Sequence, residues 1–349
     1  MPTQSTPQDP VDTEEGLQLP APTPVKPERR YTATAAMRRY IGEWIIEHLL
    51  LVVGLVAVLS VVLVLVFMLR DALPLFFGDH VGVWPFLSGT AWGPDYDPPL
   101  YGIVALVVGT LIVTVGSSLL AIPIGFACAV YLAEIAPRVV REILKPTVEM
   151  LAAIPSVVMG FVGMIVLNPI LRELLHLPTG LTALTASLML ALMAMPTVIS
   201  IAEDALSAVP ATYREGSLAL GVSKLATIRH AVLPAARSGL VAAAMLGIGR
   251  ALGETMTVLM VAGNTREMPL AFLGDGSLAL LTKFQTLVTS GFGFFGPVRT
   301  MTATLAVEMG EVEQGGAHYH ALFAVGALLC LISFAITLIS DIALRRARR

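Results

Sequence analysis

Two ionisable side chains, Arg250 and Glu254, interrupt a stretch at 239–264 that is otherwise free of charge. A helix that starts near Arg237 and rises 1.5 Å per residue reaches Arg250 after ~20 Å, close to the middle of a bilayer. Mild insertion scales assign ~2.5–3.5 kcal/mol to a charge at that depth, so the guanidinium must face protein or water. The spacing of four residues predicts that both side chains lie on one helix face, where they can neutralise each other.

This pair has two interpretations. In the first, it only holds one helix against its neighbours, because buried ion pairs often set the register of packed elements. In the second, the planar, permanently charged guanidinium binds a phosphate-like oxyanion, and Glu254 screens it when no anion is bound. A neighbouring carboxylate also keeps binding weak enough for release. Gly249 and Gly253 bracket Arg250 at GxxxG spacing, which predicts close approach of a helix from this chain or from a second subunit.

A second pattern is a charge-bearing loop between two apolar stretches. Thr212 and Glu215, three residues apart, predict a capping box at the start of a short helix. Gly221 predicts a left-handed residue that ends this helix, Ser223 predicts the cap of a second one, and Pro234 predicts its end. We interpret the loop as a compact helix-turn-helix that docks on a partner. The alternative is an ordinary amphipathic helix pair.

The elements that position these residues must lie in a membrane. Of the 349 residues, 56% are hydrophobic and 13% are charged, and the mean hydropathy is +0.79, which is more apolar surface than a soluble core could bury. Charge-free stretches that can cross ~30 Å of hydrocarbon lie at 49–69, within 98–133, at 150–171, within 177–202 and at 321–340. The stretch at 239–264 is a sixth span, because only a helix crosses lipid with its backbone satisfied. The prediction is an all-α membrane protein with six transmembrane helices.

Lys and Arg are unevenly distributed over the alternate loops of such an arrangement. One side holds sixteen of them, including those of both termini and of the charged loop, and the other side holds five. By the positive-inside rule, we expect both termini and the charged loop in the cytoplasm, and the chain in the plasma (inner) membrane. The first ~35 residues carry seven prolines, which predicts a disordered cytoplasmic tail at 1–40, before a membrane domain at 41–349.

Other activities are disfavoured by what the sequence lacks. It contains no Gly-x-x-x-x-Gly-Lys-Ser/Thr motif, so we expect ATP hydrolysis in a partner and not in this chain. A net charge of −3 without a basic block argues against nucleic-acid binding. Cys128 and Cys330 fall within predicted spans and are expected to be packing residues. His318 and His320, with Glu308, Glu311 and Glu313 nearby, could hold a cation, but we place this group at the outer membrane interface and assign the chain no metal or cofactor.

The charged loop resembles the EAA coupling loop of ABC-importer permeases. The positions that match by spacing are Glu215, Gly221, Leu233 and Pro234. The chain departs from the family at Gly216 and Ser217, where small Ala residues are usual, and these substitutions keep the side chains small. The string GIGRALGETMTVLMVAGN at 247–264 is similar to PstC-type subunits, the C-type permeases of phosphate ABC importers.

The resemblance implies the type I ABC-importer permease fold and a channel-forming subunit of an ATP-driven inorganic phosphate importer that works by alternating access. It implies a paired A-type permease, two ATP-binding subunits that use ATP and Mg, and an extracytoplasmic phosphate-binding protein. Arg250 and Glu254 would lie in the substrate pathway. The loop at about 203–237 would couple to the ATPase through Glu215, Gly216, Ser217, Gly221, Leu233 and Pro234.

Three alternatives stay open. The first is a permease for sulfate or molybdate, because one Arg does not distinguish tetrahedral oxyanions. The second is a carrier driven by an ion gradient, with Arg250 and Glu254 as a proton-coupled site, although the coupling loop argues against it. The third is a membrane scaffold that does not transport, for which a change such as Glu215→Lys would leave uptake intact.

Overall fold

The computed structural model describes residues 33–78, 81–266 and 293–347. These residues are mainly helical, with one two-stranded antiparallel hairpin that pairs Trp92 with Tyr101. The elements are α1 Ala33–Phe77, α2 Val83–Ser88, β1 Trp92–Gly93, β2 Leu100–Tyr101, α3 Val104–Val130, η1 Tyr131–Ile135, α4 Arg138–Ala152, α5 Ser156–Val162, η2 Gly163–Leu167, α6 Asn168–Leu174, α7 Ala183–Ser207, α8 Ala211–Ala219, α9 Lys224–Thr227, η3 Ile228–Val232, α10 Leu233–Ala235, α11 Arg237–Gly253, α12 Met256–Val261, α15 Met301–Glu308 and α16 Ala317–Ala347.

The predicted spans correspond to helices of the structure. Among the described residues, five helical stretches are long and apolar enough to cross a membrane, and a bent pair can be the sixth span. The five stretches are Glu43–Phe77, Val104–Ile135, Ser156–Leu174, Ala183–Ser207 and Ala317–Ile339. The all-α class with up to six spans is therefore confirmed. Of the predicted tail, residues 1–32 lie outside the described residues, whereas residues 33–40 belong to α1.

The third span begins later than predicted. The amphipathic helix α4 ends at Ala152, and α5 starts only at Ser156. Pro155 lies between them with an extended backbone, ψ 136°. A proline also disfavours helical conformation in the residue before it, so the chain turns here and cannot continue one helix from residue 150.

The sequence predicted that the fifth span is one helix to residue 264, but the structure contradicts this. The helix α11 ends at Gly253, and α12 starts at Met256. Between them the Glu254 backbone is extended, with φ −72° and ψ 131°. Two local interactions stabilise the break: the Thr255 hydroxyl donates to the Gly253 carbonyl at 3.4 Å, and the Glu254 carboxylate accepts from the Thr257 amide at 3.5 Å. Glycine is also a poor helix former, which favours an end at this position.

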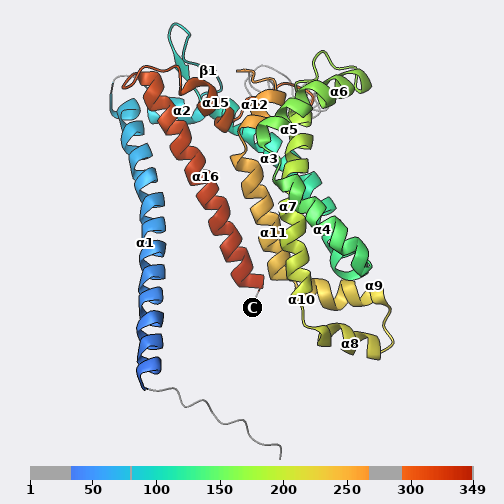
Figure 1. Ribbon diagram of the computed structural model, residues 1–349. Helices are drawn as coiled ribbons and strands as arrows, with labels where there is room; N and C mark the ends of the chain where they lie inside the picture. Colours follow the sequence, from blue (N-terminus) through green and yellow to red (C-terminus); the bar gives the residue numbers. More distant parts are fainter. Residues whose placement is uncertain (1–32, 79–80, 267–292, 348–349) are drawn as a thin grey trace, which may run out of the picture. The chain divides into compact units, whose positions relative to one another are not determined.

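The centre of the helical unit consists of α3, α7 and α11 (Figure 1). Val198 of α7 is fully buried between two glycines. A Cβ on Gly125 of α3 would lie 2.8 Å from this valine, and a Cβ on Gly247 of α11 would lie 2.5 Å from it. Because such distances leave no room for a side chain, the three helices can pack this closely only with glycine at both positions.

A second core lies where the Val62–Phe77 part of α1 meets the hairpin, α15 and α16. It contains the fully buried side chains of Leu75, Trp92, Met301 and Leu322. Phe67 of α1 also packs edge to face on Phe323 of α16, with ring centroids 6.1 Å apart. This core connects the first and last spans to the segment that carries Glu308.

Candidate functional site

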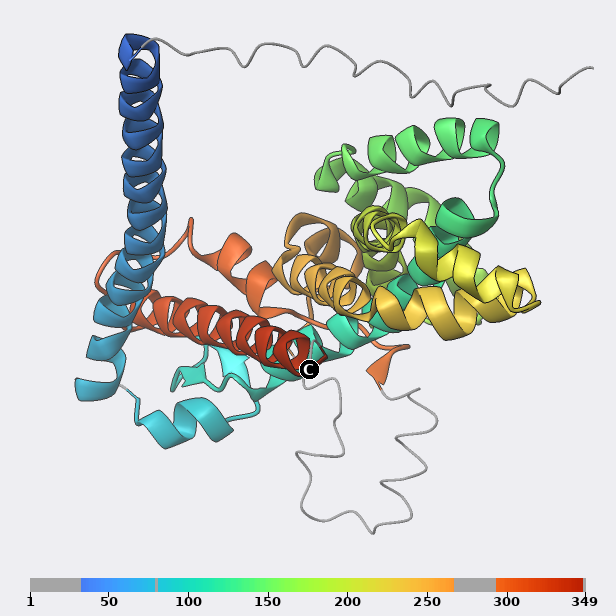
Figure 2. The same ribbon diagram turned by 90° about the horizontal axis from the view of Figure 1, so that it is seen from below.

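The charged loop is a pair of short helices that follows the Ser207 end of α7. In Figure 2 the yellow helices of the loop lie side by side, and the Ser217 and Thr227 hydroxyls link them at 2.9 Å. Gly221 has φ +76°, and the Ser223 side chain accepts from the Ala226 amide at 3.4 Å. The predicted left-handed glycine and the predicted serine cap are therefore both confirmed.

The two other local predictions for this loop are wrong. Pro210 is the N-cap of α8, so Thr212 lies inside the helix and does not cap it. The reason is that Pro210, with ψ 142°, already turns the chain into the helix two residues earlier. Pro234 does not stop the second helix either, because it occupies the first turn of α10, where no backbone N–H is needed. The chain bends by 73° between Ala235 and Arg237 instead.

The outer surface of the loop exposes apolar side chains. Leu220 is 84% exposed and Leu225 is 73% exposed, and α8 buries none of its residues. Glu215, Gly216 and Gly221 lie on the same exposed part of the chain. Large apolar side chains at such exposure on a short polar loop are typical of an interaction surface. The loop therefore presents a ready contact surface to a partner.

Two of the predicted coupling residues face inward. Ser217 bonds the buried Thr227 of α9, and Leu233 packs against the core formed by Leu206, Val232 and other buried residues. Their roles in this chain are to hold the two loop helices together and to seat them on the spans. The sequence spacing alone did not separate these inward positions from the outward ones.

Arg214 fastens the loop to the spans, a role that the sequence did not reveal. Its guanidinium donates to both Glu134 carboxylate oxygens, the shortest N···O distance being 2.5 Å. It also donates to the carbonyls of Val209 at 2.6 Å and Leu206 at 2.8 Å. Hydrogen bonding to Glu134 raises the pKa of Arg214. The signal in the sequence is weak, because Glu134 lies 80 residues earlier.

Arg250 and Glu254 do not form the predicted ion pair. The described residues include no carboxylate within 4.0 Å of the Arg250 guanidinium, which instead donates to the Thr197 hydroxyl at 3.3 Å. The prediction failed because it assumed a continuous helix, whereas α11 ends between the two residues. Thr197 lies ten residues before the end of the 25-residue α7, so Arg250 lies near the middle of that span.

Glu254 serves the backbone around the break. Its carboxylate oxygen lies 3.5 Å from both the amide and the hydroxyl of Thr257, a fully buried residue. The Glu254 carbonyl accepts from the Thr302 hydroxyl of α15 at 3.0 Å. Glu254 therefore acts as a side-chain cap of α12 from the residue before its N-cap, Thr255, and ties the break to α15.

The GxxxG glycines make no close helix contact with the part of the chain that the structure describes. An added Cβ on Gly249 or Gly253 would meet no atom within 4 Å among the described residues, and both glycines are exposed. The close approach predicted within the chain is made by Gly247 against Val198 instead. Among the described residues, Gly249, Arg250 and Gly253 thus share one open stretch of α11. The predicted contact of these glycines with a second subunit stays a prediction.

Comparison with known families decides what kind of protein carries these features. The family described as binding-protein-dependent transport system inner membrane components matches residues 121–349, which include the loop helices, α11 and α12. The chain belongs to this family. It is a permease subunit of an ABC importer and a multi-pass inner-membrane protein, and such permeases work with a further permease subunit, ATPases and a binding protein.

Several known proteins are similar to most of this chain. The probable ABC transporter permease protein YqgH of Bacillus subtilis is 34% identical over 80% of this chain and 84% of its own length. The phosphate transport system permease protein PstC of Haemophilus influenzae is 31% identical over 76% of this chain and 82% of its own length. A crystal structure of a bacterial ABC transporter for alginate import matches 89% of this chain and 98% of its own with TM-score 0.54 at 14% identity. This last likeness concerns the fold alone.

The permease also contains a buried charge cluster around Glu308 of α15. The Glu308 carboxylate accepts from Arg299 at 2.9 Å and from the Trp92 indole at 3.0 Å, and it lies 2.8 Å from His318 Nε2. The described residues contain no group of three potential metal-ligating side chains. His320 is bonded separately, to the Asp71 carbonyl at 2.6 Å. The cluster therefore holds the hairpin, α15 and α16 together.

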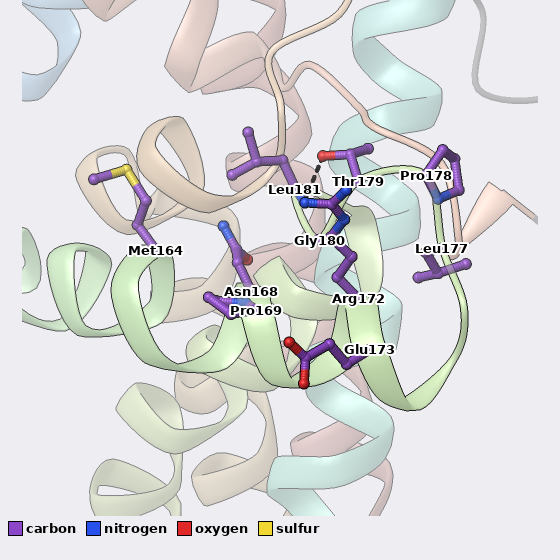
Figure 3. Close-up of a pocket in the computed structure, with 10 residues that line it drawn as sticks. All are labelled: Met164, Asn168, Pro169, Arg172, Glu173, Leu177, Pro178, Thr179, Gly180 and Leu181. Atoms are coloured by element: carbon purple, nitrogen blue, oxygen red, sulfur yellow. Dashed lines mark hydrogen bonds between the residues drawn. The ribbon is translucent and has the colours of Figure 1, made fainter.

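A cavity of about 710 Å³ with a mixed polar and apolar lining lies beside α6 and the 177–181 loop (Figure 3), at the Ala183 end of α7. Asn168 is 6% exposed, and neither polar atom of its side chain has a partner among the described residues. Figure 3 shows the Arg172 guanidinium directed towards Thr179 and the Glu173 carboxylate directed away from it. The sequence assigned no role to this cavity.

Proposed function

We propose that this chain is the C-type permease subunit of an ATP-driven importer of inorganic phosphate. The observation that supports the proposal is the guanidinium of Arg250, which lies at the middle of the spans. Among the described residues it has no carboxylate partner and donates to a neutral hydroxyl, that of Thr197. A permanent charge at that depth requires water or a polar ligand. A planar fork of N–H donors fits an oxyanion well. Several relatives at about 30% identity are named phosphate transport permeases, which supports phosphate among the oxyanions.

The missing carboxylate at Arg250 changes the expected mechanism. The sequence suggested that Glu254 would screen the guanidinium between transport cycles, but Glu254 caps α12. Release of the anion must then come from a change in the surroundings of Arg250 when the spans move. Alternating access requires such a change, because Arg250 must become accessible first from one side of the membrane and then from the other.

The proposed complex has four further parts. An A-type permease would pack against the open stretch of α11 at Gly249 and Gly253, where a second helix finds space. Two ATP-binding subunits would use ATP and Mg and would contact the exposed loop at Glu215, Gly216 and Leu220. An extracytoplasmic phosphate-binding protein would deliver the substrate at the other end of the spans. In this arrangement, the loop and both termini lie in the cytoplasm.

The test is phosphate uptake by the reconstituted complex. The complete complex, in liposomes without ion gradients, receives radiolabelled phosphate and the binding protein on one side and ATP on the loop side. We expect uptake that requires ATP and that excess sulfate or molybdate does not compete away. Competition by sulfate would replace phosphate with another oxyanion. Uptake driven by a pH gradient without ATP would favour a carrier and contradict the proposal.

A further inference from the structure

The loop helix α8 is joined to the spans by a polar anchor and not by an apolar core. None of its residues is buried. A cavity of about 410 Å³ borders its first turn and is lined by Pro210, Tyr213, Ala236 and neighbouring small residues. Where the first turn borders this cavity, side-chain packing does not hold the helix. Its firm connection must therefore come from specific bonds.

Arg214 supplies these bonds from the inner side of α8. Its side chain is 25% exposed, and that of its carboxylate partner Glu134 is 7% exposed. The guanidinium holds both oxygens of Glu134 and, with its remaining donors, the carbonyls of Leu206 and Val209. A bidentate, charge-assisted contact of this kind restricts both distance and orientation. The next residue, Glu215, is exposed on the outer side.

The partners of Arg214 belong to two of the three central helices, α3 and α7, or directly follow them. Glu134 lies in η1, the direct continuation of α3, Leu206 lies in the last turn of α7, and Val209 lies two residues after α7 ends. The helices α3 and α7 pack closely along their length, as at Gly125 and Val198. A displacement of α8 therefore reaches both helices through one side chain.

We infer that Arg214 and Glu134 form the contact that passes movement of the ATPase-bound loop to α3 and α7, so that Arg214 is a positioning residue for transport. The inference rests on the proposed coupling of the loop to an ATPase. It adds that the outward face of α8 receives the movement, while the inward guanidinium transmits it. Coupling between two sites requires a structural element whose conformational equilibrium both sites influence. The helix α8, held to the spans by Arg214, is such an element.

The variants are chosen to separate transmission from stability. Arg214→Met leaves Glu134 buried without its counter-charge, so that this complex can assemble poorly for structural reasons alone. The double variant Arg214→Met/Glu134→Leu removes both charges and so restores an uncharged, packed contact. Glu134→Gln tests the contact from the residue that does not reach the loop surface. The matched control is Arg138→Met/Glu142→Leu, which removes the exposed ion pair of α4.

The readout is the amount of phosphate imported per ATP hydrolysed by the complete complex, together with co-purification of its subunits. We expect Glu134→Gln and the double variant to assemble and to hydrolyse ATP, while phosphate imported per ATP falls about tenfold, within the range of known couplings between sites. The control pair should keep the wild-type ratio. A double variant that regains both assembly and the wild-type ratio would show that the contact only stabilises the fold and would overturn the inference.

Failure of the proposed substrate gives a different result. A wild-type complex that hydrolyses ATP but imports no phosphate contradicts the phosphate proposal. The role of the Arg214–Glu134 contact is then tested by measuring the movement of the helices. Spin labels on α3 and α8 would then report distances with and without nucleotide. The inference expects the α3–α8 distance to stay constant when nucleotide binds to the wild type, because the two helices move together, and to change in the double variant. An equal change in both proteins would overturn it.

Discussion

The Arg250 guanidinium donates a hydrogen bond to the Thr197 hydroxyl at 3.3 Å across the α7–α11 interface. This contact replaces the ion pair with Glu254 that the sequence spacing predicted. A cation with a neutral partner keeps most of its hydrogen-bonding capacity for a ligand. Arg250 and Glu254 therefore have separate contacts, and the following variants test whether their roles also differ.

Removing the Arg250 charge should abolish anion transport. Arg250→Ala is expected to lower phosphate uptake by about 100-fold or more, because a charge-assisted bidentate contact contributes roughly 3 kcal/mol. Arg250→Lys retains the charge but not the planar fork, so its phosphate uptake should lie between that of the wild type and that of Arg250→Ala. The measurement is uptake by purified complexes of equal assembly. Wild-type uptake by Arg250→Ala would exclude Arg250 from the substrate pathway.

Uptake and stability should tolerate loss of the Glu254 charge, whereas loss of its hydrogen-bond acceptor should lower stability. Glu254→Gln keeps an oxygen that can accept from the Thr257 amide, so we expect near wild-type uptake and stability. Glu254→Ala removes the cap of α12 and should cost about 1 kcal/mol of stability. Thermal unfolding of the purified complex measures both effects. A large uptake defect in Glu254→Gln, with unchanged stability, would argue that the carboxylate charge takes part in transport.

The two sets of glycines on α11 should give opposite results. Gly247→Leu places a side chain where a Cβ would already lie 2.5 Å from Val198, so the chain itself should be destabilised. Gly249→Leu meets open space among the described residues and should leave the chain's own thermal stability unchanged. We expect it to weaken co-purification of the A-type permease. Undiminished co-purification with Gly249→Leu would place the subunit interface elsewhere.

The exposed end of the loop should be needed for ATPase capture. Leu220 is 84% exposed, and Leu220→Ser removes apolar surface without touching the core. We expect co-purification of the ATP-binding subunits to fall about tenfold, which corresponds to ~1.4 kcal/mol. His230→Ala, on the exposed side of η3, is a control for changes elsewhere on the loop. Equal ATPase capture by all three proteins would contradict a docking role for this surface.

Glu308 should be among the most sensitive positions for stability. Its side chain is 6% exposed and that of Arg299 is 3% exposed, so Glu308→Leu leaves a buried guanidinium without a counter-charge. The expected loss is about 3–5 kcal/mol. Glu311→Gln, three residues later and exposed, should stay within about 0.5 kcal/mol of wild type. Thermal unfolding in detergent compares the two variants, and similar unfolding midpoints would show that the Glu308 cluster contributes little to stability.

Sequence reasoning located the spans and the loop because their signals are local. Apolar runs of sufficient length predicted helices at the positions of the spans. The left-handed conformation of Gly221 and the helix cap at Ser223 were predicted correctly from residue type. The breaks at Pro155 and Gly253 were missed because a hydropathy window does not register a short interruption inside an apolar run. At Gly253 the interruption is stabilised by the side chains of Glu254 and Thr255, whose identities looked like those of an ordinary helix.

The sequence by itself determined that the chain is a helical membrane protein with an exposed loop between its spans, because composition and spacing act over a few residues. Only the tertiary structure decided which groups meet. Arg214 lies 80 residues from Glu134, and Arg250 lies 53 residues from Thr197. These pairs exist because α3, α7 and α11 pack side by side, and the strength of a charge contact depends on distances and burial that chain order does not specify.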